Sequence, residues 1–301
     1  MKRRKLSELN VIDDFMMNAL ATNEELREPF FRRILSVLLD IDIGKIDVRA
    51  QSILQGLDTD LRGVRLDVEI TEKVAEDNQT RLSDPKDILQ DGDETSDGQI
   101  ANIYDIEPHL RKNLDFPKHN RYYQAKIDSR YVKSGLDDFE KLHNLYVITI
   151  TNFDIFGEGL FEYTVRNQLI ECPDVEYNDG LIFKYFNTKG KAGGNESIKN
   201  MLRFIENSTS ENAVDEATRE ISEYVDKVKR SSETEETYMT MGDKMDYIKQ
   251  EGIQEGIQEG IREGIAIGEQ HTISNIKEAA IEAGILEEFE KIMLEYNKMN
   301  Q

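Results

Sequence analysis

Two short segments in which acidic and apolar residues alternate constrain this chain more than any other feature. They are Leu66-Asp67-Val68-Glu69-Ile70 and Ile103-Tyr104-Asp105-Ile106-Glu107-Pro108-His109. Such alternation is typical of β-strands, because side chains two residues apart in a strand share a face. The residues predicted to share a face are Asp67 and Glu69 in the first strand, and Asp105, Glu107 and His109 in the second.

Pairing of these two strands would gather four carboxylates on one surface of a sheet. Like charges that face each other across strands destabilise a sheet, so this surface needs a compensating group. A divalent cation would supply one. The alternative is that the acidic side chains form the solvent-facing, polar side of an ordinary hairpin.

The acidic pair suits the metal-dependent hydrolysis of a phosphodiester. A bound Mg²⁺ polarises the phosphate and lowers the pKa of an attacking water, and it takes oxygen ligands that include one or two protein carboxylates. Asp67 and Glu107 are the predicted ligands, with Mg²⁺ as the expected cofactor and Mn²⁺ as an alternative. His109 lies two residues beyond Glu107 on the same face, and we expect it to orient the water or to act as a base.

The net charge of −22 argues against a nucleic-acid partner until its distribution is considered. Residues 206–301 hold 10 basic and 23 acidic residues, a net of −13, and residues 72–107 hold 3 and 11, a net of −8. The rest of the chain is nearly neutral. Within it, residues 108–135 are basic, as expected of a phosphate track beside a metal site, although a solvated charged helix is the alternative. The basic residues are Arg111, Lys112, Lys118, Arg121, Lys126, Arg130 and Lys133.

The remaining pattern predicts an α/β fold. Residues 11–40 show the apolar spacing of one or two amphipathic helices. Residues 119–134 predict another, with Tyr123, Ile127 and Tyr131 on one stripe. Residues 145–150 are nearly all apolar, as in a buried central strand. Further strands are predicted at 45–56, 63–71, 100–107, 160–165 and 181–186. This order of elements favours a mixed central sheet flanked by helices.

Three segments are predicted. Residues 1–205 form the globular domain, with an acidic insert at 72–99 that we expect to be a mobile loop. Residues 206–246 form an acidic helical connector, and residues 247–301 a helical tail. The tail repeats Glu-Gly-Ile over 251–268, and each helical glycine costs roughly 1 kcal/mol against alanine. Either a second helix packs on the glycines, which would make a homo-oligomer through 247–301, or the repeat is a frayed linker.

The cysteine count and the lengths of the apolar runs predict the cellular compartment. One cysteine, Cys172, excludes a disulfide framework and suits a reducing environment. The sequence has no apolar run near the roughly 20 residues of a membrane span. We expect a cytoplasmic protein that has no membrane partner.

Several stretches, taken in order, resemble one known family. They are Asp14-Phe15-Met16-Met17, Leu66-Asp67-Val68, Tyr104-Asp105-Ile106-Glu107-Pro108, Arg121-Tyr122-Tyr123-Gln124-Ala125-Lys126-Ile127-Asp128, Leu145 to Ile150, Asp154-Ile155-Phe156-Gly157, Asp179-Gly180 and Asn187-Thr188-Lys189-Gly190. This set resembles the PD-(D/E)XK nuclease-family transposases, or recombination-promoting nucleases, and the Glu-Gly repeat resembles tails common in that family. The resemblance spans roughly residues 10–205. It implies a restriction-endonuclease-like core and Mg²⁺-dependent DNA cleavage.

The resemblance also implies roles for individual residues. Asp67 and Glu107 become the metal ligands, and His109 stands where the fold usually has lysine and this family often has glutamine. Histidine does not hold a fixed positive charge near neutral pH, so this is a departure. The secondary acidic residues are Asp14, Glu69 and Asp105, and the DNA-binding candidates are Arg121, Gln124 and Lys126.

The sequence therefore predicts a Mg²⁺-dependent DNA endonuclease that hydrolyses phosphodiester bonds. Two alternatives stay open. One is a catalytically silent relative that binds DNA or a protein through the same fold. The other is an oligomeric scaffold that works through residues 247–301.

Overall fold

The structure is a computed structural model, and it describes residues 4–50, 53–54, 64–65, 68–73, 100–112, 115–131 and 142–299. Asp67 and most of the acidic insert, residues 74–99, lie outside the described residues. The chain divides into two compact units, Met1–Glu235 and Glu236–Gln301.

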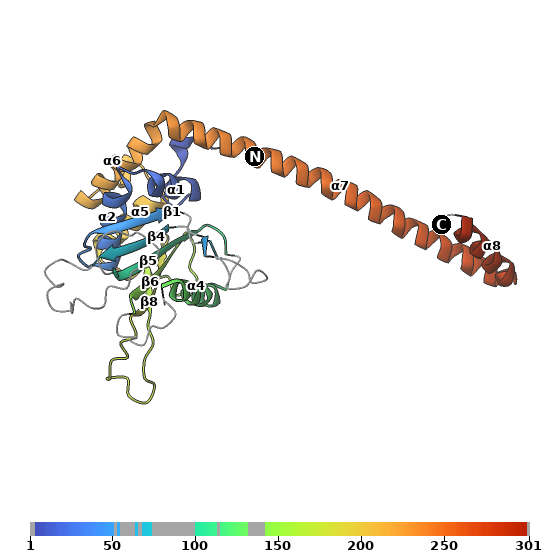
Figure 1. Cartoon of the computed structure of the whole chain (residues 1–301), viewed down its shortest axis with the longest axis horizontal. Helices are drawn as coiled ribbons and strands as arrows, with labels where there is room; N and C mark the ends of the chain where they lie inside the picture. Colours follow the sequence, from blue (N-terminus) through green and yellow to red (C-terminus); the bar gives the residue numbers. More distant parts are fainter. Residues whose placement is uncertain are drawn as a thin grey trace, which may run out of the picture. The chain divides into compact units, whose positions relative to one another are not determined.

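A six-stranded mixed sheet forms the centre of the first unit (Figure 1). The strands are β1 (Ile46–Ala50), β2 (Ile53–Leu54), β3 (Val64–Arg65), β4 (Val68–Lys73), β5 (Ile100–His109), β6 (Asn144–Thr151), β7 (Glu162–Val165) and β8 (Leu181–Asn187). The order in the sheet is β1-β4-β5-β6-β8-β7, and β2 pairs with β3 separately. The predicted α/β class with a mixed sheet is confirmed.

Among the described strands, the two parallel pairings are those of β6, and the other strand pairings are antiparallel. β6 runs parallel to β5 on one side and to β8 on the other, whereas β4 pairs antiparallel with both β1 and β5. Val147, Ile148 and Ile150 of β6 are fully buried, which confirms the predicted central strand. β4 extends through Glu72 and Lys73, so these residues belong to the sheet and not to the acidic insert.

The helices of the first unit cover both faces of the sheet. They are α1 (Asp14–Thr22), α2 (Arg27–Leu39), α4 (Phe116–Tyr131), α5 (Glu196–Glu206) and α6 (Glu216–Arg230), with short 3₁₀ turns η1 (Leu6–Glu8) and η3 (Ser210–Asn212). Figure 1 shows α1, α2, α5 and α6 together on the side of β1, and α4 on the other side, by β6 and β8. The prediction of one or two helices within 11–40 is confirmed, with two helices, α1 and α2.

Helix α6 belongs to the first unit because its apolar face is buried against other helices of that unit. Ile221, Val225 and Val228 are buried, and the helix packs against α1, α2 and α5. Asp215 caps its first turn by accepting the backbone N–H of Thr218 at 2.9 Å. The unit therefore extends to Glu235, past the boundary at residue 205 that the sequence pattern suggested.

Ile127 is the fully buried apolar residue at the centre of the contact between helix α4 and the sheet. Ile127 packs in a cluster with Ile103, Leu145 and Val147, and Tyr123 and Tyr131 lie against that cluster. Residues 123, 127 and 131 recur every fourth position, so the stripe predicted from the sequence is the stripe that meets the sheet. α4 begins at Phe116, three residues before the predicted start, because Phe116 is itself buried.

The second unit contains most of α7 (Ser232–Glu282) and all of α8 (Leu286–Met299). Gly284 has φ +70° and forms the turn between them. The repeat at 251–268 is helical throughout, and its isoleucines 253, 257, 261 and 265 are 52–58% exposed. None of the described helices is long and apolar enough to cross a membrane. Association of copies through 247–301 remains a prediction.

The packing of α4 on the sheet can be tested by removing its central contact. We expect Ile127→Ala to lower the free energy of unfolding by about 2–5 kcal/mol, because the deletion leaves a cavity that the neighbouring strands cannot fill. Tyr122→Ala, on the exposed side of the same helix, should cost less than about 1 kcal/mol. Urea unfolding of the full chain, followed by circular dichroism, measures both. Equal losses in the two variants would contradict the packing described.

Candidate acidic site between the sheet and helix α4

The acidic residues of β4 and β5 share one face of the sheet, as the alternation predicted. Glu69 lies directly opposite Asp105 in the antiparallel register, and Val68 lies opposite Ile106. On the far side of β5, Glu107 lies beside Thr149 of β6. Side chains alternate between faces along each strand, so Glu69, Asp105 and Glu107 project toward α4 together with Ile103.

This acidic face is buried. Glu69 and Asp105 are 0% exposed, and Glu107 is 2% exposed. The alternative of a solvent-facing polar hairpin is therefore wrong for these three residues. A buried carboxylate is costly unless a charge or hydrogen bonds compensate it, so the partners of each carboxylate decide what it can do.

Glu69 is compensated by the C-terminal end of α4. The guanidinium of Arg130 lies 3.0 Å from Oε2 of Glu69, and the hydroxyl of Tyr131 donates to Oε1 at 2.7 Å. Burial and the adjacent Glu69 carboxylate raise the pKa of the Tyr131 hydroxyl, so it stays protonated and donates. Both Glu69 oxygens are thus used to fasten α4 to β4, and this predicted secondary acidic residue has a structural role.

Glu107 and His109 meet at the end of β5. Nε2 of His109 lies 3.8 Å from Oε2 of Glu107, and the imidazole is 19% exposed. Burial, and to a smaller extent His119, lower the pKa of His109 from 6.5 to about 4. At neutral pH the ring is therefore uncharged and keeps one nitrogen lone pair for an acceptor role.

Aromatic rings surround His109 on the side of α4. Its ring centroid lies 5.2 Å from Phe116 and 5.6 Å from His119, both in edge-to-face geometry. His119 in turn lies 4.1 Å from the ring of Tyr123. The start of α4 thus forms an aromatic wall beside the Glu107–His109 pair.

A buried polar bridge holds the same end of α4 to the sheet. Asn120, 1% exposed, donates to the hydroxyl of Thr149 at 2.8 Å. Thr149 is the β6 neighbour of Glu107. Asn120 is also hydrogen-bonded to Tyr185 of β8, whose pKa burial raises to about 12. Asn120 therefore sets the position of α4 relative to the sheet next to Glu107.

The other sequence-predicted residues do not converge on this pair. Asp14 is exposed in the first turn of α1, and Asp67 lies outside the described residues. Arg121 is exposed on α4, whereas Gln124 is half-buried and donates to Asp128. The remaining candidate, Lys126, lies 5.5 Å above the ring of Tyr122.

A complete metal cage is not formed within the described part of the chain. Among those residues, no three His, Cys, Asp or Glu side chains group closely enough to hold an ion. Asp67, the second predicted ligand, is not among them. Glu107 and His109 are the pair whose donor atoms the structure brings together.

The sequence pattern missed the residues of α4 that complete the site. Arg130 was predicted as part of a phosphate track, but it pairs with Glu69. His119 was overlooked, although it extends the Tyr123–Ile127–Tyr131 stripe by one further step of four residues. Extending that stripe toward the N-terminus would have placed His119 against the sheet.

A fourth buried carboxylate lies on the opposite face of the sheet. Glu72 accepts hydrogen bonds from the Tyr104 hydroxyl at 2.5 Å, the Asn102 amide at 2.7 Å and the Gly44 backbone at 2.6 Å. These donors use both of its oxygens. Glu72 thus ties β4 to β5 and to the segment before β1.

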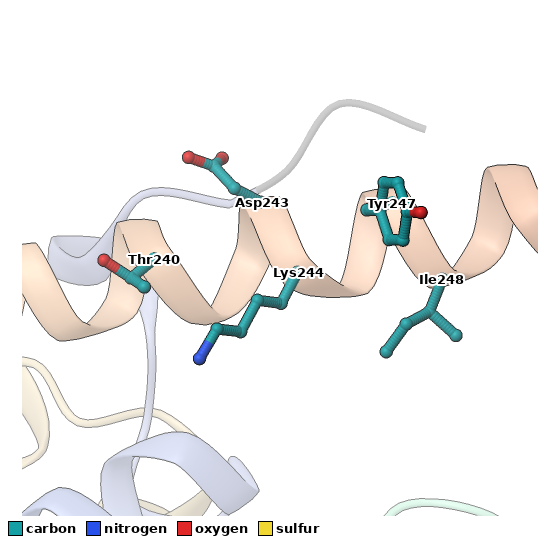
Figure 2. A pocket seen from close by; sticks show the side chains of 5 residues that line it. All are labelled: Thr240, Asp243, Lys244, Tyr247 and Ile248. Atoms are coloured by element: carbon teal, nitrogen blue, oxygen red, sulfur yellow. The ribbon is translucent and has the colours of Figure 1, made fainter.

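A shallow pocket on α7 offers no comparable chemistry. It is lined by Thr240, Asp243, Lys244, Tyr247 and Ile248, which all come from one helix. Figure 2 shows Asp243 and Lys244 pointing to opposite sides of that helix. Their charged groups do not converge, so the acidic site remains the stronger candidate.

The anchoring role of Glu69 predicts a stability loss. We expect Glu69→Gln to lower the free energy of unfolding by about 1.5–3 kcal/mol, because it removes the charge that Arg130 pairs with. Tyr131→Phe should cost about 0.5–1.5 kcal/mol. The double variant should lose less than the sum, since both changes break one network. Urea unfolding gives these values, with Glu158→Gln on an exposed loop as control; strict additivity would count against a shared anchor.

The lowered pKa of His109 predicts a pH effect. Its folded-state pKa of about 4 lies below the ordinary 6.5, so protonation favours the unfolded chain. The stability that neutral His109 contributes is present above pH 6.5 and is lost as the pH falls toward 4. Between pH 7 and pH 5 this residue should cost the wild type about 2 kcal/mol of unfolding free energy.

Unfolding measured at both pH values checks this expectation. His109→Gln should lack that part of the pH dependence, whereas His271→Gln, exposed on α7, should keep it. An unchanged pH dependence in His109→Gln would mean that the imidazole is not desolvated as described.

The site thus consists of Glu107 and His109 on β5, under the aromatic start of α4, with Asn120 and Glu69 fastening the helix. No protein-family model, curated protein or solved structure matches this chain. A function must therefore be argued from the chemistry of these residues.

Proposed function

We propose that this protein is a metal-dependent DNA endonuclease with a restriction-endonuclease-like core. The observation that carries the proposal is a buried carboxylate, Glu107, whose Oε2 lies 3.8 Å from a buried imidazole nitrogen. The sequence resemblance to recombination-promoting nucleases points to the same residue. The order of strands around β5, antiparallel to β4 and parallel to β6, supports it further.

The donor set fits a divalent cation. Glu107 would hold it together with Asp67, the acidic residue that the sequence assigns to the neighbouring strand. When bound, such an ion would polarise a phosphate oxygen and lower the pKa of an attacking water. A buried carboxylate that binds a cation also recovers part of the cost of its own desolvation.

The protein's own groups have distinct tasks in this proposal. Neutral His109 offers a lone pair beside Glu107, where the resembling family has lysine or glutamine. Asn120 and the Glu69–Arg130 pair keep α4 at a fixed position over β5. The aromatic wall of Phe116 and Tyr123 keeps bulk water away from one side of the pair.

Basic residues near the site suit a phosphate backbone. Arg111 and Lys112 follow β5 directly, and Lys118 and Arg121 lie in the first two turns of α4. All four are exposed. Contacts of this kind position a nucleic acid without reading its sequence, so the proposal names DNA as substrate and no recognition sequence.

Plasmid nicking tests the proposal. The wild type should convert supercoiled plasmid to the nicked form when MgCl₂ is present, and EDTA should stop the reaction. We expect Glu107→Gln to reduce the rate by at least about a hundredfold, the usual cost of losing a group that stabilises the transition state. Asp67→Asn should do the same. Glu162→Gln, a carboxylate on edge strand β7 that pairs with Lys184 at 3.1 Å, is the matched control and should cleave normally.

Two outcomes would count against the proposal. If the wild type and Glu107→Gln nick at the same rate, the site is wrongly assigned. If folded wild type does not nick at all, the silent alternative is favoured, in which the same surface binds DNA without cutting it. A gel-shift assay with Arg121→Ala then tells whether that binding uses α4.

A further inference from the structure

The buried nitrogen of His109 is the feature of the site that the nuclease proposal leaves without a partner. Among the described residues, Nε2 of His109 has no hydrogen-bond partner. Its separation of 3.8 Å from Oε2 of Glu107 is too long for a hydrogen bond. Leaving a buried polar atom in this state is unfavourable, so a binding partner is expected.

The geometry of the pair fits one shared metal ion. Imidazole nitrogen and carboxylate oxygen each bind such an ion at about 2.0–2.2 Å, so two donors of one ion lie at most roughly 4.2 Å apart. The 3.8 Å between Nε2 and Oε2 lies within this limit. Both donors stand on the same face of a single strand, two residues apart, so the backbone holds them in register.

The chemistry of the donors selects the ion. Carboxylate and water ligands suit Mg²⁺, whereas imidazole favours the divalent transition metals. A lysine at position 109 could not bind a metal while protonated, and a glutamine would add an oxygen ligand. Histidine instead adds a nitrogen donor to the oxygen donors of Glu107.

We propose that Glu107 and His109 together bind a divalent transition metal ion through Oε2 and Nε2, and that the site prefers this ion to Mg²⁺. The inference rests on the proposed function in that it assigns the metal of the same site. It differs in the task of His109, which is a ligand here and not the group that orients the water.

Mn²⁺ is a suitable probe because it is paramagnetic and accepts both donors. Full-length protein is loaded with MnCl₂ and examined by pulsed electron paramagnetic resonance. The bound ion should show coupling to one ¹⁴N nucleus. His109→Gln should abolish this coupling, whereas His143→Gln, a half-buried histidine just before β6, should leave it unchanged.

Calorimetric titration supplies a second readout. Mn²⁺ should bind the wild type more tightly than Mg²⁺ does. His109→Ala, which removes the nitrogen donor without adding an oxygen, should weaken Mn²⁺ by about tenfold or more, the loss that even outer partners of a metal ligand cause, and leave Mg²⁺ within about twofold. Glu107→Gln should weaken both ions.

The outcomes separate this inference from the nuclease proposal. Bound Mn²⁺ without ¹⁴N coupling, coupling that His119→Gln removes instead, or equal affinity for the two ions would each overturn the inference. Failure to bind Mn²⁺ would do so too. Each of these results is compatible with Mg²⁺-dependent nicking, so the nuclease proposal could still hold. Conversely, a protein that binds Mn²⁺ as described but never nicks DNA would contradict the nuclease proposal and not this inference.

Discussion

The compensation of buried negative charge is the constraint on which the first unit depends. Three carboxylates, Glu69, Asp105 and Glu107, lie under α4 with almost no exposure. A buried carboxylate is costly unless a charge or hydrogen bonds compensate it, and α4 compensates Glu69 with the guanidinium of Arg130, 3.0 Å away. The residues that fasten α4 to the sheet therefore have two effects. They stabilise the fold, and they keep the helix over Glu107.

Much of this arrangement was predictable from local pattern. Alternation placed Glu69, Asp105 and Glu107 on one face, and the register that sets Glu69 against Asp105 agrees with it. The apolar run of β6 identified the central strand, because a strand covered on both faces has no polar side. The four-residue stripe of α4 identified the face that packs on the sheet. In each case the spacing of apolar and polar residues along the chain indicates which side chains share a face of the strand or helix.

The remainder depended on contacts between distant segments. No period indicates that Arg130 turns toward Glu69, 61 positions earlier, since a basic residue on a helix serves a phosphate or a carboxylate equally well. The burial of the acidic face was likewise invisible, because alternation is the same for a hydrated and a covered strand. The extent of the first unit was underestimated because α6 is rich in charge, and its apolar stripe has meaning only against α1, α2 and α5.

The position of β5 inside the sheet has a consequence for rigidity. This strand has hydrogen-bonded neighbours on both sides, β4 and β6, so its backbone amides are expected to exchange with solvent only when the whole unit unfolds. The backbone that carries Glu107 and His109 therefore cannot adapt to a ligand. Any adjustment must come from side-chain rotation or from the ligand itself, so the fold fixes the two backbone positions and leaves the rotamers to set the final spacing of the donor atoms.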